Sequence, residues 1–468
     1  MTPPRPSRSP WQRGILRFAA WRRRHVAPGI TVMVLAIITG TLAGVGAWIL
    51  KYFIGHMCSF FLGFMRSGEI NWYLAALPFI GILAVAAYQR YVIRFDLEHG
   101  TARIARVIAG GSYRISPTLC YRPLLANIVT LGFGGSAGAE GPIAAAGAAI
   151  GSNVSRLFGV SPALMRVMIG CGAGAGIAGI FKAPVGGAMF TLEVLKMKIS
   201  TLSVLALMVA SVCGGMTCYA LTGFTFDVMF LPTSFFDPHT LGWVTLLGVF
   251  CGIYSVYYTR VTAMLHRFFK SFRNPWLKNL TGAAIVGGCL VLFPAMYGEG
   301  YATVTDLVNG RCDLFLDGSP FTSEISDAAM VLLLGFALLM LKVFATIASN
   351  SAGGVAGDFA PTIFAGAFAG MVFAMAVNSV FDTHLPVALF ALFGTAGAFS
   401  GIIHAPIMAM FLVAEMLGNG YGFFLPLMVT SSVSYITVKL ITPRSRYANA
   451  DHDDLSSLIK ARPAQNGK

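Results

Sequence analysis

Two short stretches of this chain combine glycine, proline and a carboxylate in a pattern that suits anion binding. Residues 138–142 read GAEGP, from Gly138 to Pro142, and residues 357–361 read GDFAP, from Gly357 to Pro361. Each stretch opens onto a long apolar run, so each predicts the first turn of a helix at membrane depth. The first N–H groups of a helix lack partners within the helix and are positively polarised. Two such starts therefore predict a site for an anion.

Glu140 is the first candidate for chemistry within these stretches. An ionisable side chain inside an apolar, small-residue segment is a functional candidate by default. Its carboxylate could take the place of the anion and compete for the same N–H groups, and protonation would then release it. We therefore expect Glu140 to act as a gate that acid opens. The alternative is an ordinary acid at a helix start that complements the helix dipole.

The composition predicts the frame that must hold these loops. The chain of 468 residues is 56% hydrophobic and only 11% charged, and it contains 53 glycines. Soluble domains carry about 25% charged residues, so we expect an all-α integral membrane protein. Several apolar runs are interrupted by Gly and Pro. This predicts broken or tilted helices whose irregular backbone lines a cavity or is buried in protein.

The charge pattern predicts how the chain lies in a membrane. The net charge is +14, and residues 1–28 carry seven arginines and no acid. By the positive-inside rule we expect a cytoplasmic N-terminal segment at 1–28, a transmembrane domain at 29–443 and a short cytoplasmic C-terminal segment at 444–468. The basic residues favour contact with anionic membrane lipids rather than nucleic acid. The eight cysteines form no CxxC pair or Cys/His cluster, so we expect no metal and no cofactor.

A second pair of stretches indicates an internal duplication. Residues 181–184 read FKAP and lead to Glu193, while residues 403–406 read IHAP and lead to Glu415. The offset here is 415 − 193 = 222, and for the first pair it is 361 − 142 = 219. Two motif pairs at nearly one offset predict a first repeat at about 29–225 and a second at about 238–443. The equivalent Lys182 and His404 are either cations at a pore mouth or snorkelling basic residues.

Taken together, these stretches resemble the CLC family of chloride channels and chloride/proton antiporters, in its prokaryotic form without CBS domains. Residues 138–142 are similar to the gating-glutamate motif of that family, and residues 357–361 resemble another of its filter motifs. Residues 298–301 (GEGY) and 307–310 (LVNG) also match a family stretch. The resemblance covers roughly residues 30–450. It implies two inverted-topology halves, a homodimer in the cell membrane, and a pore for chloride and similar small anions in each subunit.

The resemblance also implies roles for individual residues. Glu140 would be the gate, and Tyr447 would lie at the central anion site, although an aromatic anchor at the membrane interface is the alternative for that tyrosine. Backbone N–H groups would hold an outer anion and a central one. The residues that would offer them are Gly141, Asp358, Phe359 and Ala360.

The first filter motif of the family departs from its usual form in this chain. The family usually has Gly-Ser-Gly-x-Pro, whereas residues 98–102 read EHGTA and lack both the serine and the proline. His99 and Gly100 are the candidates for anion contact there, and the alternative for His99 is an ordinary interfacial histidine. A second departure is Asp358, which replaces an apolar residue. An ionised Asp358 in the pore would oppose anions, so its side chain either points away or titrates.

The third departure concerns proton coupling. Family exchangers generally carry an inner glutamate that passes protons, and its position falls here on Val194, directly after Glu193. Valine cannot carry a proton, so we expect a channel. A chloride/proton antiporter is the alternative, with Asp358, His99 or water as the inner proton route.

Two other readings come from short motifs. Residues 134–138 have the form G-x-S-x-G, which would suit an intramembrane serine hydrolase with Ser136 as nucleophile and His404 as base. That elbow requires a strand before the serine, and the preceding segment reads as a helix, so we expect no catalytic residue and no enzyme. Residues 174–179 match G-x-G-x-x-G, which without a βαβ context indicates close helix packing. A fluoride exporter ranks below chloride, because that branch usually departs from the Glu-Gly-Pro kept here.

Overall fold

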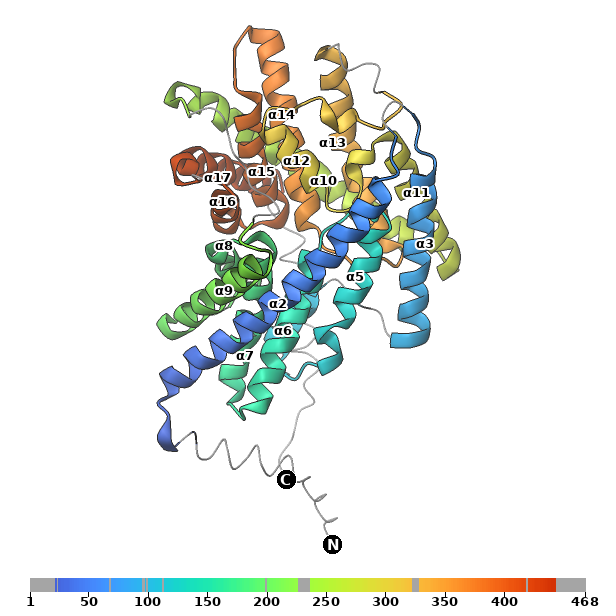
Figure 1. Cartoon of the computed structure of the whole chain (residues 1–468). Coiled ribbons are helices and arrows are strands. Elements are labelled where there is room, and N and C mark those ends of the chain that lie inside the picture. The colour runs from blue at the N-terminus through green and yellow to red at the C-terminus, as the bar shows by residue number, and fades with distance from the viewer. Residues whose placement is uncertain are drawn as a thin grey trace, which may run out of the picture.

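The computed structural model describes residues 22, 24–66, 69–94, 97, 100–111, 113–197, 200–225, 236–321, 328–417 and 420–442. All regular elements among these residues are helical, and Figure 1 shows them packed into one body. The α-helices of the first half are α2 (Pro28–Leu62), α3 (Tyr73–Ala87), α4 (Gly100–Gly110), α5 (Arg122–Gly132), α6 (Glu140–Leu157), α7 (Pro162–Phe181), α8 (Pro184–Met189) and α9 (Thr201–Leu221). Those of the second half are α10 (Leu241–Lys270), α11 (Pro275–Leu292), α12 (Tyr301–Val308), α13 (Ala328–Ser351), α14 (Phe359–Phe381), α15 (Val387–Ile403), α16 (Pro406–Glu415) and α17 (Phe424–Ile441).

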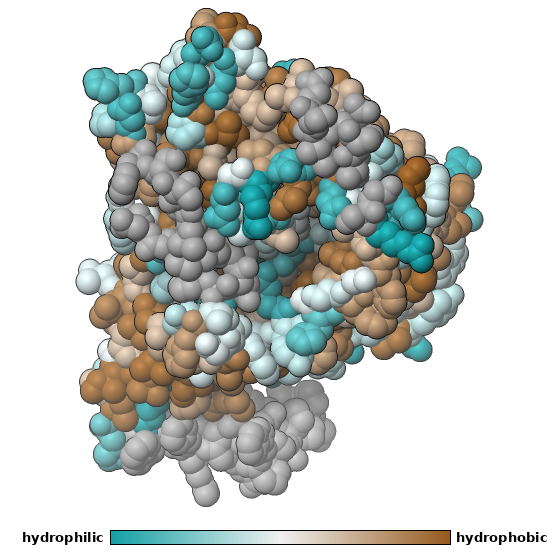
Figure 2. All heavy atoms as spheres, turned by 45° about the horizontal axis from the view of Figure 1, so that its top comes forward, coloured by the Kyte–Doolittle hydropathy of each residue, from teal (hydrophilic) through white to brown (hydrophobic). Residues whose placement is uncertain are grey.

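Within the described ranges, nine helices are long and apolar enough to cross a membrane. Many of their large apolar side chains point outwards, among them Ile37 on α2, Leu205 on α9 and Ile436 on α17. Figure 2 shows apolar surface over much of the molecule, with hydrophilic residues in the middle of the face that it presents. An outer surface of this kind suits lipid rather than water. The predicted class, an all-α integral membrane protein, is confirmed.

The two halves contact one another through equivalent groups. The Glu193 carboxylate accepts hydrogen bonds from Ile407 N and Met408 N at the start of α16, at 3.3 and 2.7 Å. The equivalent contacts in the other direction also form. Glu415 accepts from Val185 N and Gly186 N at the start of α8, at 2.9 and 2.7 Å. Such a reciprocal exchange is what a pseudo-two-fold axis between duplicated halves produces, and each carboxylate satisfies N–H groups that a helix start leaves without partners.

The predicted pair Lys182 and His404 also occupies equivalent backbone positions. Lys182 ends α7 with φ 53° and His404 ends α15 with φ 64°, so both residues are left-handed C-caps. Lys182 Nζ donates to Thr225 O, and the His404 ring lies edge-on to Tyr435 at 6.2 Å. Both side chains therefore have structural partners. Their conformation adds a third point at which the halves match.

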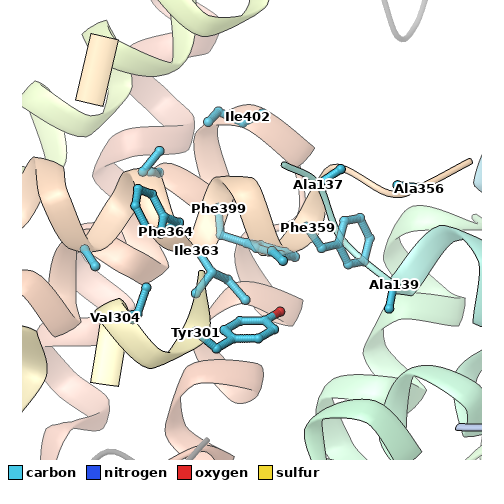
Figure 3. Packing of buried hydrophobic residues seen from close by; sticks show 14 of the residues in the cluster. Ala137, Ala139, Tyr301, Val304, Ala356, Phe359, Ile363, Phe364, Phe399 and Ile402 are labelled. Carbon is cyan, nitrogen blue, oxygen red and sulfur yellow. The ribbon is translucent and has the colours of Figure 1, made fainter. Parts of the chain in front are cut away.

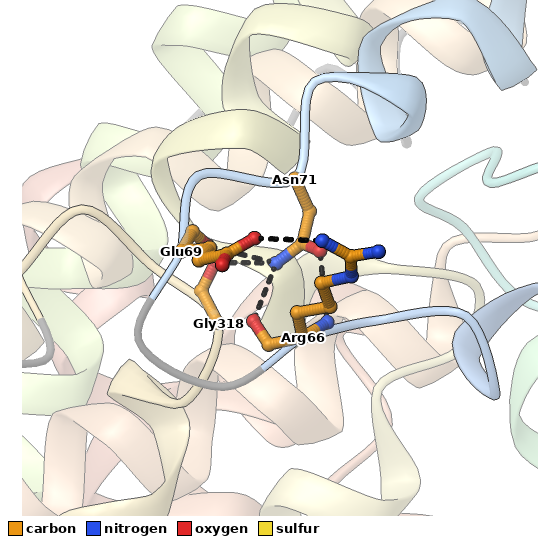
Figure 4. A network of polar contacts seen from close by, with 4 residues as sticks. All are labelled: Arg66, Glu69, Asn71 and Gly318. Carbon is orange, nitrogen blue, oxygen red and sulfur yellow. Dashed lines mark hydrogen bonds and ion pairs between the residues drawn. The ribbon is translucent and has the colours of Figure 1, made fainter.

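A polar contact fixes the connection between α2 and α3 to the second half. Asn71 accepts a hydrogen bond from Arg66 N at 2.9 Å and donates to Arg66 O, Glu69 O and Gly318 O (Figure 4). Gly318 is distant in sequence and follows α12. This asparagine therefore ties the end of α2 to the segment that follows the short helix α12.

Candidate functional site

The two predicted anion loops lie side by side and are hydrogen-bonded to each other. Gly138 N donates to Gly357 O at 2.8 Å, and Gly357 N donates to Gly138 O at 2.7 Å. The offset between these residues is 357 − 138 = 219, which is the offset of the motifs themselves. In Figure 1, α6 occupies the lower part of the molecule and α14 the upper part, so the helices leave this junction in opposite directions. Both N-termini therefore converge on one point.

Both helices begin in the same way at this junction. The first helical bonds run from Ile143 N to Ala139 O at 3.1 Å and from Thr362 N to Asp358 O at 3.2 Å. Pro142 and Pro361 occupy the first turns, where a missing N–H has no cost. The N–H groups that precede the first helical bonds have no partner within their own helix. Those groups belong to Glu140, Gly141, Phe359 and Ala360, of which the last three are the predicted anion donors.

Side chains of helix α5 are hydrogen-bonded to both loops. Asn127 Nδ2 donates to Gly138 O at 3.3 Å and to Val355 O at 2.8 Å. Thr130 Oγ1 accepts from Val355 N at 3.1 Å. These two side chains therefore hold a loop of the first half and a loop of the second half in one register. Glycine is required at 357, because a Cβ there would lie 2.7 Å from the backbone Gly141 N, and a Cβ on Gly138 would displace the Glu140 carboxylate.

The Glu140 side chain is fully buried at this junction. Its Oε1 accepts a hydrogen bond from the Tyr301 hydroxyl at 2.8 Å, and its Oε2 has no hydrogen-bond partner. Oε2 lies against the two bridged glycines, 3.2 Å from where a Cβ on Gly357 would be. The carboxylate thus lies on the point where two helix N-termini meet, which is where an anion would be stabilised.

Aromatic rings surround the junction. The Phe359 ring packs edge-on against Phe190 at 5.7 Å and against Phe399 at 5.1 Å. The Tyr301 ring packs edge-on against Phe181 at 6.1 Å. Figure 3 shows the Tyr301 hydroxyl pointing towards the side where Ala139 and Phe359 lie. These rings exclude water, so polar groups at the junction interact in a medium of low dielectric constant.

An ion pair lies against the face of the Tyr301 ring. Lys51 Nζ on α2 is 2.7 Å from Glu299 Oε2, and both side chains are nearly buried. The same Nζ lies 4.8 Å from the centre of the Tyr301 ring. Glu299 Oε1 is buried without a hydrogen-bond partner. A cation, two carboxyl groups and a phenol therefore form one continuous set of contacts between α2 and the start of α12.

A second buried cation reaches the loop before Glu140. Lys342 on α13 is completely buried, and its Nζ donates to Ser136 Oγ at 2.9 Å and lies 4.3 Å from the centre of the Phe364 ring. The hydroxyl of Ser136 is thus paired with a lysine and not with His404. The segment before it is helix α5, so the strand that a nucleophile elbow requires is absent from this described segment. The serine hydrolase reading is wrong for these residues.

Asp358 is turned towards α13. Its Oδ1 accepts a hydrogen bond from Asn350 Nδ2 at 3.0 Å. The backbone of Asp358 still forms the N-cap of α14 and presents that helix to the junction.

The remaining predicted residues are placed as follows. Gly100 begins α4, which lines a pocket together with Pro142 and Ala356 and so lies beside both loops. Arg103 also lines this pocket. Val194 is half-buried at the end of a short π-helical segment, Phe190–Val194, next to Glu193. His99 and Tyr447 lie outside the described residues. The described part of the chain holds no group of three His, Cys, Asp or Glu that could bind a metal.

Four side chains of this site were not predicted. Lys51 and Lys342 are lone cations within apolar runs, and this signal alone marks an intramembrane residue as a candidate. Glu299 and Tyr301 belong to the GEGY stretch, which indicated the family but not a role. Their contact with Glu140 joins residues 161 positions apart, which no local pattern reveals.

Comparison with known proteins identifies the group to which this arrangement belongs. The model of the voltage gated chloride channel family matches residues 80–439, and the chain therefore belongs to the CLC family. It is 26% identical over 445 residues to the H(+)/Cl(-) exchange transporter ClcA of Vibrio cholerae, covering 91% of this chain and 90% of that protein. It is 27% identical over 403 residues to a putative chloride channel protein, ClcB-like, of Ralstonia nicotianae, covering 84% and 89%.

Solved structures share the fold. A slow cyanobacterial Cl-/H+ antiporter superposes with a TM-score of 0.73 at 22% identity, over 92% of this chain and 99% of that one. A CLC-type fluoride/proton antiporter superposes with a TM-score of 0.70 at 23% identity, over 88% and 95%. The chain is thus a multi-pass membrane protein of an anion-transport family and not an enzyme. Because the named exchangers are among its relatives, the expectation of a channel is less well supported than its alternative.

Proposed function

We propose that this protein exchanges chloride for protons, with Glu140 as both the gate and the proton carrier. The observation that carries the proposal is the position of one carboxylate. It is buried where the N-termini of α6 and α14 meet, with Tyr301 on one oxygen and the bridged glycines against the other. The kinship with named H(+)/Cl(-) exchangers supports the same function.

In this mechanism the Glu140 carboxylate and a chloride ion compete for the same backbone N–H groups. An ionised Glu140 satisfies the positive potential of both helix starts and closes the path. Protonation removes its charge, so a chloride ion becomes the better ligand for the N–H groups of Gly141, Phe359 and Ala360. Loss of the proton on the other side restores the carboxylate and expels the anion. One side chain thereby links the two fluxes.

The inner part of the proton route must bypass Val194. Val194 cannot carry a proton, so Asp358, His99 or water must do so. A chloride channel is the second candidate function, and Val194 is the observation that favours it. In a channel, Glu140 would gate the anion path without proton transfer through the protein.

The two candidates differ in their reversal potential. We would reconstitute the full chain in proteoliposomes and measure the potential at which chloride flux reverses, with and without a pH difference. An exchanger predicts a reversal that shifts with the proton gradient, and a chloride gradient should then drive protons uphill. A reversal fixed at the chloride equilibrium potential would refute exchange and establish the channel. Fluoride in place of chloride tests the anion, and stronger coupling with fluoride would overturn chloride as substrate.

The variant Glu140→Gln tests the role of the carboxyl group. Glutamine mimics the protonated form, so we expect anion flux that no longer depends on pH and carries no protons. Glu69→Gln is a matched control, because Glu69 is an exposed acid in the α2–α3 connection. A Glu140→Gln protein that stays closed at neutral pH, or that still moves protons, would contradict the role.

We further propose, from the family resemblance, a homodimer with one pore in each subunit and cytoplasmic termini. Chemical crosslinking in the native membrane tests the first, with a dimer-sized product expected. Labelling of single cysteines introduced into residues 1–28 tests the second, with reaction expected only from the cytoplasmic side.

A further inference from the structure

We propose that the Lys51–Glu299 ion pair sets the proton concentration at which Glu140 is released, and that Glu299 and Lys51 act on it in opposite directions. This inference rests on the proposed gating role of Glu140. It assigns a function to two charged residues from opposite halves of the chain. Both residues are linked to Glu140 through Tyr301, so we treat both as positioning residues.

The contacts lead from the pair to the gate. Lys51 Nζ bridges Glu299 Oε2 at 2.7 Å and the face of the Tyr301 ring at 4.8 Å from its centre. The hydroxyl of the same ring donates to Glu140 at 2.8 Å. Lys51 therefore holds both the second carboxylate and the ring whose hydroxyl fixes the gate.

Burial of this ion pair costs free energy, and a purely structural role does not explain that cost. Glu299 Oε1 and Glu140 Oε2 are both buried without a hydrogen-bond partner. Burial of an ion pair in low dielectric is often no more stabilising than burial of apolar side chains of similar volume. Glu140 and Glu299 are linked through Tyr301 and Lys51, and each keeps one buried oxygen without a hydrogen-bond partner. This arrangement is therefore better explained by function than by stability.

Electrostatics gives the direction of each effect. Tyr301 contacts both Lys51 Nζ and the Glu140 carboxyl group, and Lys51 contacts Glu299, so both charges lie within the range of Coulomb interaction with Glu140. The negative charge of Glu299 disfavours an ionised Glu140 and so favours its protonation, whereas the positive charge of Lys51 favours the ionised form.

The other titratable groups near Glu140 contact other partners. Cys58 lies on α2 next to the ion pair, and its Sγ faces Leu131 O. Lys342 reaches Ser136 from α13, and Asp358 is turned to Asn350. Among the described residues, Lys51 and Glu299 are thus the charged pair that contacts the tyrosine bound to Glu140.

The test is a double-mutant cycle with charge-neutralising variants, in which the pH dependence of chloride flux is measured. We would measure chloride flux of the full chain in proteoliposomes over roughly pH 4–8, a range in which a carboxyl group can titrate. The proteins compared are the wild type, Lys51→Met, Glu299→Gln and the double variant. We expect Glu299→Gln to move the half-maximal pH down and Lys51→Met to move it up. Each shift should be about one pH unit, since a charge at about 10 Å in an effective dielectric of about 20 changes an equilibrium roughly tenfold. The double variant should return near the wild type.

The outcomes separate this inference from the proposed function. A flat profile in the wild-type protein would refute the gating role of Glu140 itself. A wild-type profile that Glu140→Gln abolishes, together with unshifted profiles in both single variants, would refute only the role of the ion pair. Shifts of both variants in one direction would show a structural role and also overturn it. Asp306→Asn is the matched control, because this acid pairs with Arg311 at the far end of α12 and should leave the profile unchanged. If one single variant does not fold, the other still decides, because an unshifted or oppositely shifted profile in it overturns the role of the pair.

Discussion

Tyr301→Phe is the substitution that most directly tests how Glu140 is held. It removes one hydroxyl and keeps the ring, so the contact with Lys51 and the edge-on packing on Phe181 are preserved. What is lost is the 2.8 Å hydrogen bond to Glu140 Oε1. We expect the gate to open at a higher pH in the variant, because this bond is stronger when the carboxyl group is ionised.

The magnitude follows from the difference between two kinds of hydrogen bond. A hydrogen bond to a charged group contributes about 1.5–3 kcal/mol, and one between neutral groups contributes about 0.5–1.5 kcal/mol. The ionised form of Glu140 therefore loses roughly 1–1.5 kcal/mol more than the protonated form when the hydroxyl is removed. Since about 1.4 kcal/mol corresponds to one pH unit, the half-maximal pH of chloride flux should rise by about one unit. The sign is upward, because a less stable ionised form takes up its proton at a lower proton concentration.

The assay is chloride efflux from proteoliposomes across a pH series, with reconstituted protein checked for a single elution peak. Tyr254→Phe is the matched control, because the Tyr254 hydroxyl is also buried but donates to Leu339 O at 3.1 Å, on α13. An unshifted or lowered half-maximal pH in Tyr301→Phe, with normal elution, would show that this hydroxyl does not hold the gate. An equal shift in Tyr254→Phe would attribute the effect to general loosening of the protein.

Two further predictions concern groups that support the junction. Lys342→Met should weaken chloride binding several-fold by calorimetry, because it removes a buried positive charge beside Ser136; melting should change little, since methionine fills a similar volume. Unchanged affinity would exclude Lys342 from the anion site. Glu193→Gln and Glu415→Gln should each lower the free energy of unfolding by about 1–2 kcal/mol, because each weakens two charge-assisted bonds. Thermal melting in detergent should show similar losses in the two variants, and a loss in one alone would argue against equivalent roles.

The sequence predicted the parts of this protein that local patterns determine. The motif offset predicted the duplication, and the reciprocal bonds of Glu193 and Glu415 match it residue for residue. The isolated position of Glu140 in an apolar run predicted a buried functional acid, and its burial is complete. These features are visible in sequence because an ionisable group in an apolar run has few structural uses.

The partners of Glu140 could not be predicted in the same way. Its contact with Tyr301 and the contact of Lys342 with Ser136 cross 161 and 206 residues, and such contacts depend on how helices pack rather than on local spacing. The pairing of Gly138 with Gly357 is also non-local, yet it follows from the duplication, since equivalent residues near a pseudo-two-fold axis must face each other. Symmetry therefore predicts contacts between equivalent positions and requires reciprocal pairs such as those of Glu193 and Glu415, but it does not predict the contact of Glu140 with Tyr301.

The departures from symmetry are where a specific function can be built on this frame. Glu140 begins one half-helix and Phe359 the other, so the two equivalent starts carry an acid and an aromatic ring. The acid can replace an anion, while the ring packs against Phe190 and Phe399 and leaves its own N–H available. Tyr301, Lys51 and Glu299 then act on the acidic start alone. A duplicated frame thus supplies two converging helix dipoles, and in the function we propose, one titratable side chain with its charged neighbours makes their shared site responsive to protons.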